Sequence, residues 1–289
     1  MRPSLKCDRK KMRVSIIFGS FFIDVELNKL RWKIANMSTF LENILDVENL
    51  SPLSKNILSS VAMALYFKFV IEMTCFIRLK WADRDGPTGL ARNFLHICFS
   101  FLVLFWPYFD TSDGWSWKLS AIVPAVMFSR LVYKSILVRD AYDADVQNMS
   151  ISGSPTDLLL GPLLLAGVFV WLTLYQFMTE KAAIIAAMSF GDGCAPIFGS
   201  LYGRHFYSTP VSRVKTVEGS VVGVFLGTVT ACYFNLYAMG LPLLPLRMIL
   251  AYGGIAAVAE GTAPGNLDNL VAPLVLHLSI DRVKELLPP

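Results

Sequence analysis

The sequence contains little charge. Only 17% of its 289 residues are Asp, Glu, Lys or Arg, whereas 54% are hydrophobic and the mean hydropathy is +0.52. A soluble domain of this length needs a much more highly charged surface. The composition therefore excludes a typical water-soluble domain and indicates an integral membrane protein.

Several motifs of well-known enzyme classes are missing. The five cysteines form no CxxC pair, which argues against a disulfide framework and against a structural zinc site. With three histidines and no HExxH, a zinc hydrolase has little support. The absence of GxxxxGK[ST] excludes a P-loop, and the glycines around Asp192 do not fit the GxGxxG of a dinucleotide fold. No base-reading motif is visible, so nucleic acid is not an expected partner.

Long apolar runs are plentiful, and they predict an all-α, polytopic transmembrane bundle of about seven or eight helices. A hydrocarbon core of about 30 Å requires about 20 residues per helix. The runs are continuously apolar and lack the alternation of a transmembrane β-barrel. The predicted spans are 57–77, 94–109, 117–138, 158–178, 181–203, 217–239, 246–260 and 269–280.

Two regions are predicted: a polar tail over residues 1–56 and a transmembrane domain over 57–289. The tail carries ten of the 26 Lys and Arg residues and is expected to be a targeting or interfacial segment. Its acidic residues and its short apolar run VSIIFGSFF match neither a clean secretory signal nor an acid-poor transit peptide. Whether 57–77 crosses the membrane stays open, because a crossing there would place the Lys-rich tail on the opposite side.

The loops differ in charge. Chain parity from residue 94 onward places the segment before residue 94 and the loops 139–157, 204–216 and 261–268 on one face. That face carries Arg78, Lys80, Arg84, Arg92, Arg139, Arg204, Arg213 and Lys215, and the opposite face carries Lys118, Lys181, Arg247, Arg282 and Lys284. By the positive-inside rule, the first face is cytoplasmic or its equivalent in an organelle.

One predicted span contains a carboxylate. Asp192 lies between two glycines in SFGDGCAPIFGSLYG, residues 189–203. A charge at the centre of a spanning helix costs about 3 kcal/mol on insertion scales, so such a residue usually faces a cavity, a partner or an ion. Both a polar bond between helices and a bound cation would account for Asp192.

Small residues recur at every fourth position in three consecutive spans. They are Gly191, Ala195, Gly199 and Gly203, then Gly219, Gly223 and Gly227, then Gly253, Ala257 and Gly261. This spacing predicts close helix packing, which by itself names no reaction.

Each of these spans also has an acidic residue, either within the span or close to one of its ends. The acids are Asp192, Glu218, Glu260 and Asp268. Clustered carboxylates beside Lys215 and Arg213 suit a Mg²⁺ ion held against the phosphates of a nucleotide. We therefore predict that the four acids converge on such a site.

Three blocks of sequence carry a family resemblance. GDGCAPIFGSLYGR, KTVEGSVVG and AEGTAPGNLDNLVAPL, in this order, resemble the membrane-embedded CTP-dependent lipid kinases: phytol and farnesol kinases, dolichol kinase and fungal-type diacylglycerol kinase. Upstream, ARNFLHICFSFLVLFWPYF and SGSPTDLLLGPLL extend the resemblance to about residues 90–280.

The resemblance implies an enzyme of the endoplasmic reticulum or plastid membrane that transfers the γ-phosphate of CTP, with Mg²⁺, to the hydroxyl of a phytol-, farnesol- or dolichol-type alcohol. The implied catalytic residues are Asp192, His96 and Arg92, with Asp192 or His96 as general base. The implied metal ligands are Asp192, Asp268, Glu218 and Glu260. The implied nucleotide-binding residues are Gly191, Gly193, Gly199, Arg213, Lys215, Thr216, Glu218, Gly219 and Ser220.

The sequence departs from the family pattern in two places. Asn93 replaces the usual lysine, and Asp268 is single where the family often has a pair. A CTP-dependent diacylglycerol kinase and a cytidylyltransferase similar to CDP-diacylglycerol synthase remain alternatives, although the C-terminal signature of the latter is absent from LHLSIDRVKELLPP. An ion-coupled secondary transporter is the non-enzyme alternative, because it also uses glycine-broken helices and midplane acids. The oligomeric state is not predicted.

Overall fold

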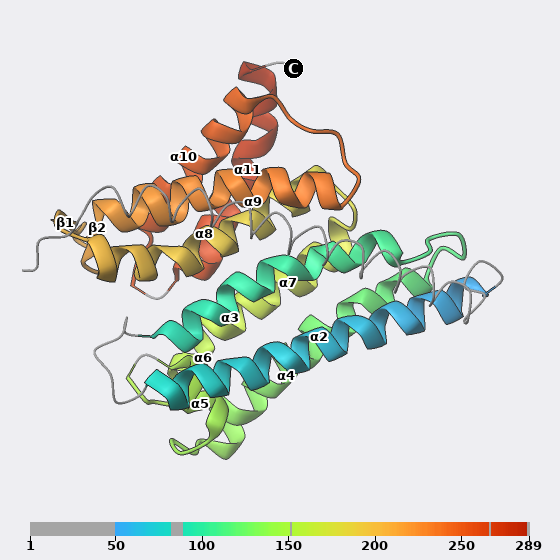
Figure 1. The fold of residues 1–289 in the computed structure, drawn as a ribbon, viewed down its shortest axis with the longest axis horizontal. Coiled ribbons are helices and arrows are strands. Elements are labelled where there is room, and N and C mark those ends of the chain that lie inside the picture. Colours follow the sequence, from blue (N-terminus) through green and yellow to red (C-terminus); the bar gives the residue numbers. More distant parts are fainter. Residues whose placement is uncertain (1–49, 82–88, 151, 266, 288–289) are drawn as a thin grey trace, which may run out of the picture. The chain divides into compact units, whose positions relative to one another are not determined.

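The computed structural model describes residues 50–81, 89–150, 152–265 and 267–287 (Figure 1). The described residues from Pro52 onward form one compact unit. The predicted polar tail lies, up to residue 49, outside the described residues, so its targeting or interfacial role stays a prediction.

The described chain is predominantly helical. Its α-helices are α2 (Pro52–Trp81), α3 (Leu90–Ser100), α4 (Ile122–Val132), α5 (Ala144–Met149), α6 (Asp157–Leu160), α7 (Pro162–Tyr175), α8 (Glu180–Tyr202), α9 (Gly227–Ala238), α10 (Leu246–Thr262) and α11 (Asp268–Leu286). Two 3₁₀ segments, η2 (Phe101–Tyr108) and η3 (Ser116–Ala121), and two π-helical segments, η4 (Tyr133–Val138) and η5 (Gly219–Leu226), extend them. The strands β1 (Phe206–Tyr207) and β2 (Lys215–Thr216) form a short antiparallel ribbon. The prediction of an all-α bundle is confirmed.

Six helical segments are long and apolar enough to cross a membrane. They are Pro52–Lys80, Leu90–Tyr108, Ser116–Val138, Asp157–Tyr175, Glu180–Tyr202 and Gly219–Ala238. The first of these covers the range 57–77, whose ability to span was left open. The other two predicted spans are helical, but α10 has only 17 residues and α11 carries four charged side chains in its last two turns.

The small-residue pattern produces close contacts between α8 and the η5–α9 segment. A Cβ atom on Gly223 would lie 2.5 Å from the backbone nitrogen of Ala195, and one on Gly227 would lie 3.0 Å from Cα of Gly191. Only residues without bulky side chains allow backbones to approach this closely. In α10, by contrast, Gly253 packs against the Phe225 and Val229 side chains rather than against a second row of small residues.

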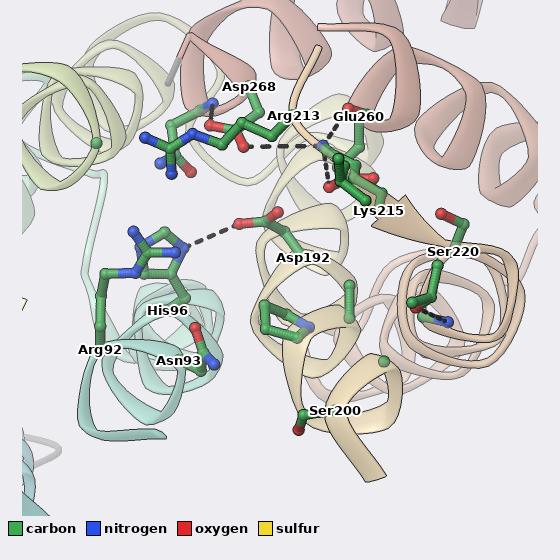
Figure 2. A pocket seen from close by; sticks show the side chains of 18 of the residues that line it. Arg92, Asn93, His96, Asp192, Ser200, Arg213, Lys215, Ser220, Glu260 and Asp268 are labelled. Carbon is green, nitrogen blue, oxygen red and sulfur yellow. Dashed lines mark hydrogen bonds and ion pairs between the residues drawn. The ribbon is translucent and has the colours of Figure 1, made fainter. Parts of the chain in front are cut away.

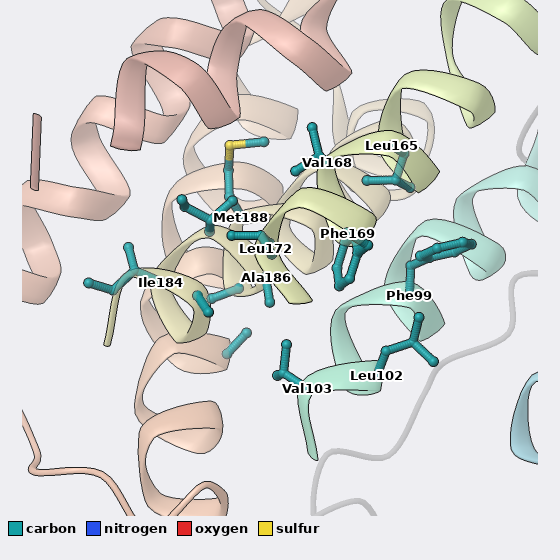
Figure 3. Close-up of a cluster of buried hydrophobic side chains, with 14 of the residues drawn as sticks. Phe99, Leu102, Val103, Leu165, Val168, Phe169, Leu172, Ile184, Ala186 and Met188 are labelled. Carbon is teal, nitrogen blue, oxygen red and sulfur yellow. The ribbon is translucent and has the colours of Figure 1, made fainter. Parts of the chain in front are cut away.

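A buried apolar core fixes α3, α7 and α8 against one another (Figure 3). Phe99 of α3 contacts Phe169 of α7 edge-on, with ring centroids 5.3 Å apart. Leu172 and Ile184 are fully buried in the same cluster. Because interiors of this kind are close-packed, the polar ends of these helices are held in fixed positions.

Candidate active site

A cavity of ≈390 Å³ lies where several polar helix ends and the β-ribbon meet (Figure 2). Its lining comes from α3, α6, α8, the β-ribbon, η5, α10 and α11. The lining residues are Arg92, Asn93, His96, Asp157, Gly161, Asp192, Ala195, Pro196, Gly199, Ser200, Phe206, Arg213, Val214, Lys215, Thr216, Gly219, Ser220, Glu260, Asp268 and Asn269. All four pieces that chain parity placed on the predicted cytoplasmic face thus contribute residues to one site.

Three of the four predicted metal ligands meet in this cavity. Asp192 lies within α8, Glu260 near the end of α10 and Asp268 at the first position of α11. One carboxylate oxygen from each lies within 4.8 Å of the other two. The second oxygen of Glu260, Oε2, is buried and has no hydrogen-bond partner among the residues that the structure describes. Hard oxygen ligands in this arrangement fit a divalent cation such as Mg²⁺.

Lys215 is the counter-charge of the acidic cluster. Its ammonium group forms an ion pair with the Glu260 carboxylate and lies 4.0 Å from Oδ2 of Asp268. The Lys215 and Glu260 side chains are only 14% and 7% exposed. Buried charges that are paired in this way are costly to separate, so the Lys215–Glu260 pair holds these two side chains together at the site.

His96 reaches Asp192 from the facing helix α3. Its Nδ1 lies 3.0 Å from Oδ2 of Asp192, and the histidine is 3% exposed. Nε2 of the same ring is buried without a hydrogen-bond partner in the described part of the chain. Arg92, one turn earlier on α3, lines the same cavity. The predicted catalytic trio of Asp192, His96 and Arg92 therefore shares one site.

Glu218 lies elsewhere. Its carboxylate accepts a hydrogen bond from the His205 backbone N–H at 3.3 Å and lies 2.7 Å from the His205 imidazole. The hydrogen bond with His205 lowers the pKa of Glu218 to about 2. Glu218 is absent from the three-carboxylate cluster and from the cavity lining. In this arrangement it supports the loop before η5 rather than facing the cluster.

Apart from Glu218, the predicted nucleotide-binding residues divide into two groups. Gly191 and Gly193 lie in interhelical contacts: a Cβ on Gly191 would meet Thr228, and one on Gly193 would meet Ile97. The others at the cavity are Gly199, Arg213, Lys215, Thr216, Gly219 and Ser220. Oγ1 of Thr216 accepts the Gly219 N–H at 3.1 Å, which joins β2 to the start of η5.

Asp157 and Asn269 are among the polar lining residues that sequence reasoning did not single out. Asp157 belongs to the block SGSPTDLLLGPLL, and Asn269 directly follows Asp268. Both lie inside sequence blocks that carry the family resemblance, and that position is the signal that could have identified them. Asp157 accepts hydrogen bonds from the backbone N–H and hydroxyl of Ser152, which tie the 152–157 loop to α6.

Fold and site together define a polytopic helical membrane protein with a charged cavity at one end of its bundle. A family model described as the cytidylyltransferase family matches residues 50–262, most of the chain. The chain belongs to that family. The family resemblance drawn from the three sequence blocks is thereby confirmed, because the chain is also similar to plant proteins named as phytol kinases.

Three such relatives illustrate the similarity. The chain is 29% identical to "Probable phytol kinase 2, chloroplastic" of Oryza sativa subsp. japonica over 65% of this chain and 64% of that protein. It is 30% identical to "Probable phytol kinase, chloroplastic" of Zea mays over 59% of this chain and 56% of that protein. It is also 30% identical to "Probable phytol kinase 1, chloroplastic" of Oryza sativa subsp. japonica over 68% of this chain and 65% of that protein. The matched region spans less than two thirds of the length of these relatives.

Proposed function

We propose that this protein is an integral-membrane lipid kinase that transfers the γ-phosphate of CTP to the hydroxyl of an isoprenoid alcohol, in a plastid membrane. The observation that carries the proposal is the convergence of Asp192, Glu260 and Asp268 on one cavity that also holds Lys215 and His96. Phosphoryl transfer depends mainly on positioning and charge neutralisation, and this cavity offers both.

The charges of the cavity support a requirement for Mg²⁺. Four acidic residues line it, Asp157, Asp192, Glu260 and Asp268, against three basic residues, Arg92, Arg213 and Lys215. This balance would repel a triphosphate on its own. A Mg²⁺ ion held by the Asp192, Glu260 and Asp268 carboxylates would supply positive charge to the phosphate oxygens. The unpartnered Oε2 of Glu260 is consistent with this role.

The basic residues are placed to hold the nucleotide. Lys215 already lies among the carboxylates, and Arg92 and Arg213 line the cavity from other segments (Figure 2). Arginine recognises phosphate through paired N–H donors, whereas lysine acts as a point charge. We assign phosphate binding to Lys215 and Arg213, and orientation of the transferred group to Arg92.

His96 is the favoured general base. A proton on Nδ1, donated to Asp192, leaves Nε2 as an acceptor inside the site. In the proposed step, the alcohol oxygen bonds to the γ-phosphorus, the bond from that phosphorus to the bridging oxygen breaks, and CDP leaves. The hydroxyl proton passes to Nε2 of His96.

The donor, the acceptor and the compartment rest on the relatives. These relatives are named as chloroplastic phytol kinases, and the matching family is that of the cytidylyltransferases. That description also favours one second candidate, transfer of the cytidylyl group of CTP to a phosphatidate-type lipid with release of pyrophosphate. The two reactions differ in which phosphorus of CTP reaches the lipid.

One assay separates the candidates. Purified full-length protein in detergent is given Mg²⁺, CTP labelled at the α- or γ-phosphorus, or γ-labelled ATP, and a panel of phytol, farnesol, dolichol, diacylglycerol and phosphatidate. Transfer of γ-label to an isoprenoid alcohol is the expected result. Transfer of α-label to phosphatidate would replace the proposal with the cytidylyltransferase. Faster transfer from ATP than from CTP would contradict the proposed donor.

A further inference from the structure

A second, almost wholly apolar hollow lies between α4, α7 and α11. It measures ≈360 Å³, and every residue lining it is apolar except His277. Phe128 comes from α4, Gly167 and Trp171 from α7, and Leu274 and His277 from α11. Apolar hollows of this size are typical of small-molecule sites.

Two neighbouring elements carry lining residues of the charged cavity and of the hollow close together in sequence. On α11, Asp268 and Asn269 line the cavity, and Leu270 and Pro273 line the hollow. On the other side, Gly161 lines the cavity, and Leu163 and Leu164 of α7 line the hollow. The polar and apolar linings therefore adjoin within two residues on both elements.

The hollow is also open to the exterior of the bundle. Phe128, Leu270 and Leu274 on its border are 38%, 43% and 53% exposed. From Asp268 to His277, at 1.5 Å per helical residue, the lining extends about 14 Å away from the carboxylates. A molecule with a polar head in the cavity and an extended apolar tail would fit this combination.

The geometry points to the α4–α7–α11 hollow as the site that holds the hydrocarbon tail of the lipid alcohol, with its hydroxyl in the charged cavity. The inference rests on the proposed kinase function. Lipid chains are as apolar as the hollow, so the tail gains little from leaving the bilayer. The gain is orientation, since a tail fixed along α11 places the hydroxyl near the carboxylates.

Gly167 sets the width of the hollow. A Cβ atom there would lie 3.3 Å from the Phe128 ring, so larger side chains would project into the space beside that ring. Gly167→Leu should block the tail, whereas Gly167→Ala should narrow the hollow. Leu274→Trp fills it from the facing helix. Leu278→Trp is the matched control, because Leu278 is 65% exposed on the same helix and lies outside the lining.

The kinetic test compares acceptors of different lengths. Gly167→Leu and Leu274→Trp should lower kcat/KM for a twenty-carbon isoprenoid alcohol about 10–100-fold. The same two variants should change kcat/KM for a five-carbon alcohol less than about twofold. Leu278→Trp should leave kcat/KM unchanged for both alcohols. Equal loss for both alcohols, or no loss in either variant despite normal folded yield, would overturn the tail site.

A second readout does not depend on turnover. An isoprenoid alcohol with a diazirine at the tail end is photolysed on the wild-type protein, and the labelled peptides are identified by mass spectrometry. Label concentrated on α7 and α11, displaced by unlabelled alcohol but not by phosphatidylcholine, is expected. Label spread over lipid-facing α2, or displaced equally by phosphatidylcholine, would identify ordinary boundary lipid and overturn the inference. Competed labelling without any phosphoryl transfer would retain the tail site and reject the kinase.

Discussion

His96 and Asp192 form a 3.0 Å contact between the facing helices α3 and α8, although 96 residues separate them in sequence. The partner carboxylate fixes the orientation of the imidazole, and the unpartnered Nε2 remains for a reacting group. In this pair, His96 has the position of a general base and Asp192 that of the carboxylate that orients it. Two further carboxylates lie beside them. The catalytic proposals follow from this relationship.

Replacing the imidazole should slow the chemical step. His96→Gln removes the proposed proton acceptor, and loss of a general base typically lowers kcat 10²–10⁴-fold. The KM for CTP should change little, because His96 is assigned to the alcohol and not to the phosphates. Steady-state kinetics from pH 5 to 9 test this, and an unchanged kcat would remove His96 from the mechanism.

Asp192→Asn should nearly abolish transfer while preserving folding. The change keeps the side-chain shape and removes the charge that faces both His96 and the proposed Mg²⁺ site, so we expect a loss of at least about 100-fold in kcat. Asp281→Asn is the control, because Asp281 pairs with Lys181 and its side chain is 63% exposed. A surface pair of this kind contributes little. Retention of most activity in Asp192→Asn would refute the metal assignment.

Metal dependence can be tested separately from loss of charge. Removal of Mg²⁺ with EDTA should stop transfer, and added Mg²⁺ should restore it. Asp268→Asn weakens one of three ligands, so the Mg²⁺ concentration for half-maximal activity should rise at least about 10-fold, since even substitution of residues that only orient metal ligands lowers metal affinity about 10–100-fold. A Mg²⁺ titration of wild type and variant measures the shift. Coinciding curves would place Asp268 outside the metal site.

Most of the fold could be predicted because lipid restricts the options. A spanning segment must satisfy its backbone hydrogen bonds internally, so an apolar run of sufficient length is a helix. The β-ribbon could not be predicted, since strands of two residues show no periodicity. The π-helical form of the Gly219–Leu226 segment could not be predicted either, because an apolar run looks the same in a π-helix and in an α-helix.

The site could be predicted in part. Asp192, Glu260 and Asp268 belong to blocks that packing brings together, and their convergence in the structure follows the prediction. The position of Glu218 depends on the path of the loop from residue 204 to 216, which places the His205 imidazole 2.7 Å from its carboxylate. Sequence spacing alone cannot specify that path. The role of Gly191 could not be decided from sequence either. A GxxxG pattern is compatible both with helix packing and with contact to a ligand, and it does not distinguish the two.

Lys215 should stabilise the protein as well as bind nucleotide. Lys215→Met leaves the Glu260 carboxylate buried without its ion pair, and breaking such a pair costs about 3–5 kcal/mol. The apparent unfolding temperature in detergent should fall by roughly 5–15 °C.

The matched double variant separates stability from activity. Lys215→Met with Glu260→Gln carries neither charge, so most of the lost thermal stability should return while phosphoryl transfer remains absent. Additive destabilisation in the double variant would show that the two side chains are not energetically coupled.

The contact between α8 and η5 should tolerate no added side chain. A Cβ on Gly223 would overlap the backbone of Ala195, so Gly223→Val must push the two helices apart and should destabilise the protein by about 1–3 kcal/mol or more. Because α8 carries Asp192, the phosphoryl-transfer activity of each folded Gly223→Val molecule should also fall.

Gly254→Ala is the matched control within α10, where a Cβ would meet nothing within 4 Å. Reduced backbone freedom in the unfolded chain should make that change neutral or stabilising by up to about 1 kcal/mol. Thermal unfolding and activity per folded molecule test this, and equal behaviour of the two variants would show that the close approach is not required.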